Sequence, residues 1–246
     1  MQRKSIKTGD IIKLGDHVLA CGDATDQDFV SKVIGEHKVD VILTDPPYGI
    51  DYVQSKKGFS EIAHKKDIKN DGFMSDTEYS EFTQKWLKPV FGHMSEKNSI
   101  YIFNSDRMIF ALRDGLLRVG GRFTQLLVWI KNTSVMARLN YMPQHELILY
   151  GWYGKHKFRR SQDKSVLYCP KPSKSTLHPT MKPIALLRKL ILNSTEVGEA
   201  VYDCFGGSGS TLIACEHTKR RCIMIEQDPE YCQTIINRYH KIHENR

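Results

Sequence analysis

The chain has 246 residues, of which 40% are hydrophobic and 26% are charged, and its formal net charge is +8 at pH 7. This is an ordinary globular composition, and the length suits one large α/β domain, so we expect a single domain over residues 1–246. No apolar run is long enough for a membrane span and residues 1–13 do not resemble a signal peptide, so we expect a cytoplasmic protein with no membrane partner. None of the six cysteines forms a C-x-x-C pair, so no metal site is expected.

Short apolar segments alternate with amphipathic segments along the chain. The sequence predicts seven strands, over residues 17–21, 39–44, 99–103, 124–130, 146–150, 200–204 and 222–225. It predicts five helices, over residues 76–94, 107–119, 184–194, 210–217 and 229–240. Strands of nearly continuous apolar residues that alternate with helices indicate an α/β fold with a mainly parallel sheet, covered on both faces.

The predicted strand 39–44 runs directly into Asp45, Pro46, Pro47 and Tyr48. Open α/β sheets bind ligands beyond the carboxyl ends of their strands. The prolines fix the turn and remove two N–H donors, and Asp45 adds a carboxylate acceptor. Two fixed acceptors can hold both hydrogens of an amino group, and Tyr48 offers a face on which a flipped base can stack. We therefore interpret these residues as the catalytic centre for methylation of a base amine; the alternative is a Pro-Pro turn with an incidental Asp and Tyr.

A glycine-rich turn follows the predicted strand 200–204 and precedes a predicted helix. Such a turn lets the backbone approach a ligand closely at a helix N-terminus. No Lys follows Gly209, as a P-loop requires, and the glycine spacing differs from that of NAD-binding proteins. Glu226 lies 23 residues after Asp203, where an acid can bind ribose hydroxyls.

Two basic segments, residues 54–69 and 155–174, lie between the predicted strands. A run of charge on its own is typical of a solvated surface. Two such segments in a chain with this catalytic turn favour contact with DNA phosphates. We expect a basic DNA-contact loop at 53–73 and a target-recognition insertion at 151–177. The basic residues expected to bind DNA are Lys56, Lys57, Lys157, Arg159 and Arg160.

Six sequence blocks in order resemble the β-class amino-methyltransferases of DNA, particularly the small modification methylases of phages and prophages. The blocks are Leu19 to Ala24, Thr44 to Gly49, Gln144 to Glu146, His178 to Pro183, Asp203 to Thr211 and Ile225 to Tyr231. The resemblance covers roughly Gly15 to Tyr239. It implies a Rossmann-like methyltransferase fold with a mostly parallel seven-stranded sheet. It also implies circular permutation, in which the catalytic strand precedes the cofactor loop.

The resemblance implies S-adenosylmethionine (SAM) as cofactor, double-stranded DNA as substrate and a possible homodimer in a restriction-modification setting. Asp23 would receive the adenine end of SAM, Thr180 and Lys182 its methionine end, and Glu226 its ribose. The remaining cofactor-binding residues would be Asp45, Asp203, Phe205, Gly206, Gly207, Ser208, Gly209 and Thr211.

Several of these residues have simpler interpretations. Asp23 could cap the segment that follows it, Thr180 could cap the helix that begins near residue 184, and Lys182 could be a surface charge. His145 and Glu146 could wall the base pocket, or His145 could be an ordinary residue at a strand edge.

The choice of substrate also leaves alternatives open. Asp45 favours N6 of adenine, whereas cytosine-N4 enzymes of the resembling family commonly have Ser at this place. Methyltransferases of RNA and of protein amides usually have Asn there. Two alternatives belong to other functional classes: a catalytically silent module that binds DNA and SAM, and an NAD-dependent oxidoreductase.

Overall fold

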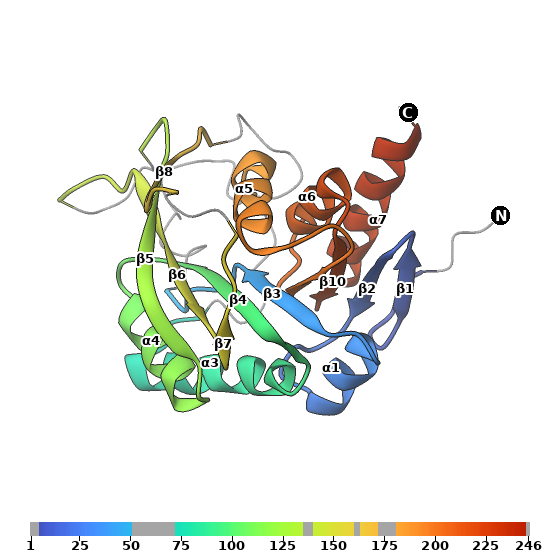
Figure 1. The fold of residues 1–246 in the computed structure, drawn as a ribbon, viewed down its shortest axis with the longest axis horizontal. Coiled ribbons are helices and arrows are strands. Elements are labelled where there is room, and N and C mark those ends of the chain that lie inside the picture. Colours follow the sequence, from blue (N-terminus) through green and yellow to red (C-terminus); the bar gives the residue numbers. More distant parts are fainter. Residues whose placement is uncertain (1–4, 51–71, 135–139, 160–162, 172–180, 245–246) are drawn as a thin grey trace.

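The computed structural model describes residues 5–50, 72–134, 140–159, 163–171 and 181–244. These residues form a ten-stranded mixed sheet with helices on both faces (Figure 1). The strands are β1 (Ile11–Leu14), β2 (His17–Cys21), β3 (Val39–Thr44), β4 (Met94–Asn104), β5 (Arg122–Ile130), β6 (His145–Trp152), β7 (Lys155–His156), β8 (Val166–Tyr168), β9 (Ala200–Asp203) and β10 (Arg221–Glu226). The helices are α1 (Gln27–Ile34), α3 (Asp76–Phe91), α4 (Ile109–Arg118), α5 (Ile184–Ser194), α6 (Ser210–Thr218) and α7 (Pro229–Glu244).

All seven predicted strands and all five predicted helices are present. The three additional strands, β1, β7 and β8, are only four, two and three residues long. The additional helix α1 has eight residues and is capped by Asp26, whose side chain accepts hydrogen bonds from the backbone N–H groups of residues 28 and 29. The start of α3 has a capping box formed by Ser75 and Glu78.

The sheet is parallel through its centre. Its strand order is β1-β2-β10-β9-β3-β4-β6-β5-β8, with β7 beside β4. Strands β2, β10, β9, β3 and β4 all run in the same direction, so their carboxyl ends meet along one side, here called the carboxyl edge. The opposite side is the amino edge. Strand β3 precedes β9 by about 160 residues in the chain but lies beside it, with Ile42 opposite Tyr202.

Two apolar cores lie on the two faces of this sheet. Helices α1, α3 and α4 cover one face, where Trp86 and Tyr79 are fully buried. Helices α5, α6 and α7 cover the other face (Figure 1). Strand β3 contributes Ile42 to the first core and Val41 and Leu43 to the second. Burial of both faces explains why the strand has no alternation of polar and apolar residues.

The described residues contain no helix that is both long and apolar enough to cross a membrane. Within the same ranges, no three His, Cys, Asp or Glu side chains are grouped so that they could hold a metal ion. The six cysteines are free thiols, and all except Cys169 are buried.

Candidate active site

The turn after β3 places its acidic and aromatic side chains at the carboxyl edge. The Tyr48 hydroxyl donates a hydrogen bond of 2.8 Å to Asp45 Oδ1. Pro46 is buried, so the turn is anchored in the protein. Gly49 ends the turn at a φ of +63°, and a Cβ atom there would lie 3.1 Å from Met74 and 3.2 Å from Tyr79. The turn is therefore held both by its prolines and by close packing against the start of α3.

Lys182, in the segment before α5, reaches into this turn. Its Nζ lies 2.5 Å from Asp45 Oδ2 and 3.1 Å from Glu146 Oε2. Glu146 Oε1 lies in turn 2.6 Å from Lys131 Nζ. The four residues Lys131, Glu146, Lys182 and Asp45 thus form one row of alternating charge, here called the charge row. A residue expected at the cofactor site therefore directly contacts Asp45, the acid expected to hold the base amine.

The ionisable groups of the charge row perturb one another. Burial raises the pKa of Asp45; Lys182 opposes this shift, and Glu146 adds to it. Burial also acts to raise the pKa of Glu146, but Lys182 and Lys131 together hold it below its ordinary value. Burial alone would lower the pKa of Lys182, but the two carboxylates raise it instead. Of the two acids, Asp45 has the raised pKa and is therefore the more easily protonated.

Asp203, at the end of β9, lies next to the last residue of β3. Its Oδ1 accepts hydrogen bonds from Thr44 Oγ1 at 2.7 Å and from the backbone N–H of Phe205 at 3.2 Å. Burial raises the pKa of Asp203 to about 7, although its hydrogen bonds from Thr211, Thr44 and Phe205 oppose the shift. The pairing of β3 with β9 thus brings the expected catalytic and cofactor halves together.

The glycine turn between β9 and α6 is closely packed. A Cβ atom on Gly206 would lie 2.8 Å from Met224, and Gly209 has a φ of +81° and approaches Ile235 equally closely. The backbone N–H of Gly207 donates a 2.6 Å hydrogen bond to Glu226 Oε2. Larger residues would displace the loop, and the loop is fixed to the end of β10.

Arg238 of α7 supports the same loop from behind. Its Nη1 donates to the backbone oxygen of Ser208, and lies 3.1 Å from Ser208 Oγ and 3.4 Å from Ser210 Oγ. Desolvation by burial lowers the pKa of Arg238. The guanidinium therefore ties the last helix to the glycine turn.

Two further acids complete the carboxyl edge. Glu226 ends β10, and burial raises its pKa to about 7. Asp23 follows β2, the neighbour of β10, and its Oδ1 accepts hydrogen bonds from the N–H and hydroxyl of Thr25. Asp23 thus holds a local turn, while Asp26 caps α1. Carboxylates that accept hydrogen bonds, beside a backbone that a ligand can approach closely, fit the hydroxyls and amines of an adenosine-containing cofactor.

Phe205 is partly buried beside this loop. Its ring packs against those of Trp86 and Phe82, with centroid distances of 5.5 and 6.0 Å. The expected cofactor residues that are described, from β2, β9, the glycine turn and β10, therefore lie along one edge of the sheet. Thr180 lies outside the described residues.

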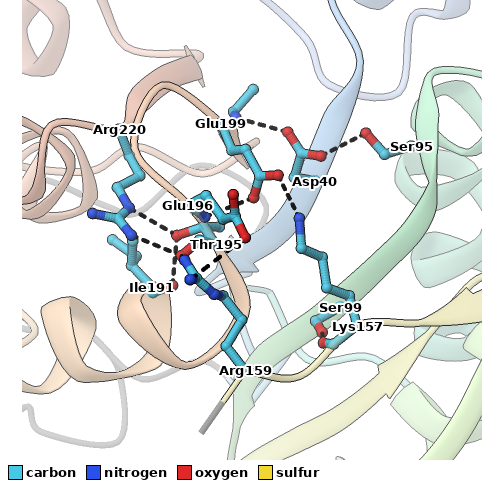
Figure 2. Close-up of polar contacts among 11 residues, drawn as sticks. Asp40, Ser95, Ser99, Lys157, Arg159, Ile191, Thr195, Glu196, Glu199 and Arg220 are labelled. Carbon is cyan, nitrogen blue, oxygen red and sulfur yellow. Dashed lines mark hydrogen bonds and ion pairs between the residues drawn. The ribbon is translucent and has the colours of Figure 1, made fainter.

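The expected DNA-binding residues are placed differently. Lys157 pairs with Glu199, and Arg159 lies 3.4 Å from Glu196, both at the amino edge (Figure 2). Strand β3 has six residues, so at about 3.3 Å per residue this network lies roughly 17 Å from the catalytic turn along the strand direction. The structure therefore gives these two cations acidic partners away from the catalytic turn. The remaining expected DNA-binding residues, Lys56, Lys57 and Arg160, lie outside the described residues.

Lys131 was not among the expected site residues, and Glu146 was expected only as a possible wall of the base pocket. A signal for both was present. Lys131 directly follows a predicted strand and Glu146 opens the next. Because β5 and β6 pair antiparallel, with Ile130 opposite His145, the end of one lies beside the start of the other. Arg238 had no comparable signal, since it reaches the glycine turn from a distant helix.

Comparison with known proteins shows the family to which the chain belongs. Residues 39–238 match the model of a DNA methylase family that includes N6 and N4 enzymes. The type II methyltransferase M.HpaI of Haemophilus parainfluenzae is 28% identical, over 91% of this chain and 74% of its own length. The type II methyltransferase M2.MboI of Moraxella bovis is 27% identical, over 87% of this chain and 85% of its own.

Solved structures show the same fold. The M1.HpyAVI–SAM complex is 27% identical and superposes with a TM-score of 0.65, covering 89% of this chain and 98% of that one. The cytosine-N4-specific PvuII DNA methyltransferase, at 17% identity, superposes with a TM-score of 0.71 over 92% of this chain and 89% of its own. The family match spans most of the chain, including the catalytic turn and the glycine turn, and the protein belongs to the N6/N4 DNA methylase family.

Proposed function

We propose that the protein transfers a methyl group from SAM to the exocyclic N6 amine of an adenine flipped out of a short DNA sequence. The observation that carries this proposal is the position of Asp45. Its carboxylate lies at the end of β3, beside Asp203 and the glycine turn that follows β9. A base amine held by Asp45 therefore lies next to the strand end at which the cofactor is expected.

The residues of the turn prepare the amine for attack. Asp45 and the carbonyl groups of the Pro-Pro turn accept its two N–H groups, which favours a lone pair localised on nitrogen. Tyr48 donates to Asp45 and offers a ring face to the base. As the nitrogen–carbon bond forms and the carbon–sulfur bond breaks, the amine gives up one proton, which Asp45 accepts. The raised pKa of Asp45 makes it a competent acceptor for that proton.

The carboxyl edge provides the groups that would hold SAM. Glu226 would accept hydrogen bonds from the ribose hydroxyls, Asp23 would lie at the adenine, and the backbone of the glycine turn would pass close to the cofactor. When bound, SAM supplies an electrophilic methyl group on a sulfonium ion. Holding both partners side by side at the carboxyl edge replaces an encounter in solution by proximity, which contributes several orders of magnitude to the rate.

The choice of adenine depends on Asp45. A full carboxylate at this position is typical of adenine-N6 enzymes of the resembling family, whereas Ser is common in cytosine-N4 enzymes. N4 methylation of cytosine is the second candidate, because the same family includes enzymes for both bases.

We propose that DNA approaches the carboxyl edge, where the turn is. Residues 53–73 and the part of 151–177 that follows Arg159 are the segments that we assign to target recognition. Lys157 and Arg159 are excluded from this proposal because each faces a glutamate at the amino edge.

Mass spectrometry of the product tests the proposal. Purified protein is incubated with SAM and unmethylated genomic DNA, which is then digested to nucleosides. We expect N6-methyladenine. N4-methylcytosine would overturn the choice of base, and product formed on RNA but not on DNA would overturn the substrate. SAM binding measured by calorimetry without any methylated nucleoside would favour a catalytically silent module.

A further inference from the structure

The charge row links four elements of the fold to the candidate catalytic turn. Lys131 follows β5, Glu146 lies on β6, Lys182 precedes α5 and Asp45 follows β3. The successive N···O distances are 2.6, 3.1 and 2.5 Å. Four elements that are distant in sequence therefore converge on one line of alternating charge, and its last member is the acid expected to hold the base amine.

The two lysines of this row are buried. Only 8% of the Lys182 side chain and 6% of the Lys131 side chain are exposed. Their ammonium groups lie over aromatic rings, 5.1 Å from the Phe103 centroid and 5.2 Å from that of Trp129. A buried ammonium group is costly unless carboxylates neutralise it, and here two lysines face two carboxylates. The position of Lys182 is therefore maintained by both acids.

We propose that Lys182 is a positioning residue for methyl transfer, and that Glu146, held by Lys131, fixes Lys182 against Asp45. This inference rests on the proposed function. Lys182 holds Asp45 Oδ2 while the Tyr48 hydroxyl holds Oδ1. A carboxylate has about two lone-pair directions on each oxygen, so each oxygen keeps one for the amine. The carboxylate is thus fixed in orientation without being blocked.

Ionisation of Asp45 is the reason that the position of Lys182 matters. A protonated carboxyl would present an O–H donor to the amine and lose part of its acceptor capacity. Burial favours this neutral form, and the charge of Glu146 favours it further. The adjacent ammonium of Lys182 favours the anion. Removal of Lys182 would leave two facing acids, of which one would take up a proton at higher pH than in the wild type.

Other ionisable groups also face Asp45. Tyr48 lies on the same turn, with Tyr79 of α3 behind it, and Asp203 approaches from β9. The pKa of Asp203 is raised by burial to about 7, so its titration falls within the range of an activity profile. A pH experiment on Asp45 therefore needs the Asp203→Asn variant as a reference, since the hydrogen bond from Thr44 can be retained by an amide oxygen.

The test is the pH dependence of the single-turnover methylation rate on DNA, with SAM affinity measured separately by calorimetry. For Lys182→Met we expect SAM affinity within about tenfold of the wild type and a rate at pH 7 lower by about 10² or more. We expect the acidic limb of the profile to move to higher pH, so that raising the pH restores part of the rate. Lys182→Arg, which keeps the cation, retains the position of the limb.

Glu146→Gln gives the complementary result. Without the Glu146 carboxylate, Lys182 pairs with Asp45 alone, and Glu146 no longer repels the charge of Asp45. The acidic limb of the pH profile therefore moves to lower pH. Opposite shifts in the two variants are not expected from a loss of packing. Lys189→Met is the matched control, because Lys189 pairs with Asp163 from α5, 2.9 Å away, and does not belong to the charge row. Because Asp163 lies in the segment assigned to target recognition, Lys155→Met is a second control: Lys155 pairs with Glu96 on the exposed surface and should leave the rate and the limb unchanged.

Three outcomes would overturn the inference. An unchanged rate and limb in Lys182→Met would show that Asp45 does not depend on Lys182. A lower rate with an unmoved limb would reduce Lys182 to a packing role. Loss of SAM binding with an unmoved limb would instead make Lys182 a cofactor ligand. Failure of the wild-type protein to methylate DNA would contradict the proposed function itself, so the two failures are distinguishable.

Discussion

Both edges of the central sheet carry lysine–carboxylate pairs, but the acids of these pairs have different environments. At the amino edge, Lys157 is held by Glu199, which also accepts the backbone N–H of Glu196 at 2.7 Å. Asp40, near the start of β3, accepts hydrogen bonds from Ser95 Oγ at 2.7 Å and from the N–H of Ala200 at 2.9 Å (Figure 2). These acids join the segments that enter neighbouring strands.

At the carboxyl edge, burial shifts the ionisation of the acids. Burial raises the pKa of Asp45, and raises those of Asp203 and Glu226 to about 7. Asp45 retains lone pairs that no described donor takes. We expect similar lysine–carboxylate pairs to stabilise the structure at the amino edge and to orient the acceptor of the base amine at the carboxyl edge. The distinction lies in burial, which raises the pKa values of the acids at the carboxyl edge.

The strongest test of this contrast replaces one aspartate at each end of β3, Asp45 at the carboxyl edge or Asp40 at the amino edge. Asp45→Ala should lower the single-turnover methylation rate by at least about 10³, or roughly 4 kcal/mol, because it removes a fixed acceptor of the reacting amine. SAM affinity, measured by calorimetry, should stay within about tenfold. Asp40→Asn is the matched control, and the methylation rate of its folded fraction should equal that of the wild type. Near-normal turnover by Asp45→Ala would contradict the catalytic assignment.

A second test concerns the cost of burying acids at the carboxyl edge. The pKa of Asp203 is about 7 in the folded protein, above its ordinary value of 3.8, so the unfolded chain ionises more easily. The contribution of this group to stability is therefore present at low pH and is lost as the pH rises from about 4 to about 7. Relative to Asp203→Asn, the unfolding free energy of the wild type should fall over that range, by at most about 4 kcal/mol.

Urea denaturation of both proteins at several pH values measures this difference. Glu226 is common to both proteins, so its titration cancels in the comparison. If the two stability curves stay parallel between pH 4 and pH 8, Asp203 does not titrate in the folded protein in this range.

A third test addresses the support of the glycine turn by α7. Arg238→Met removes the donor that holds Ser208 and Ser210, so the turn should become less well ordered and SAM affinity should fall by about tenfold. Arg118→Met is the control, since Arg118 is exposed and pairs with Asp114 on the same helix. Equal SAM affinities in both variants would show that the turn is held adequately without Arg238.

The elements of this fold that sequence analysis predicted are those with a strong local signal. Strand β3 is apolar throughout because both its faces are buried, and α5 was predicted with the bounds that it has. The missed strands β1, β7 and β8 are too short to show a pattern and are defined by their partners. Strand β4 begins at Met94, earlier than predicted, because Met94 pairs with β3 and the polar residues Lys97 and Asn98 pair with β7.

The residues of the candidate site also fall into those that the sequence predicted and those that it did not. The catalytic turn and the glycine turn are each a continuous stretch of sequence, so the residue types of each were enough to predict its chemistry. The charge row is not contiguous, because its members come from four elements. The interpretation of Lys157 and Arg159 shows the same difficulty: a basic run does not reveal which acids fold against it, and here they are Glu199 and Glu196, about 40 residues further on.

The smallest expected effect tests whether Lys157 is structural. Lys157→Met breaks a partly buried pair in which the side chains are 19% and 24% exposed, so the unfolding free energy should fall by about 1 kcal/mol. Lys155→Met is the matched control: Lys155 pairs with Glu96, the side chains are 66% and 73% exposed, and the change should be close to zero. In both variants the salt dependence of DNA binding should match the wild type. A slope reduced by about one unit in Lys157→Met alone would indicate a phosphate contact and move the DNA surface to the amino edge.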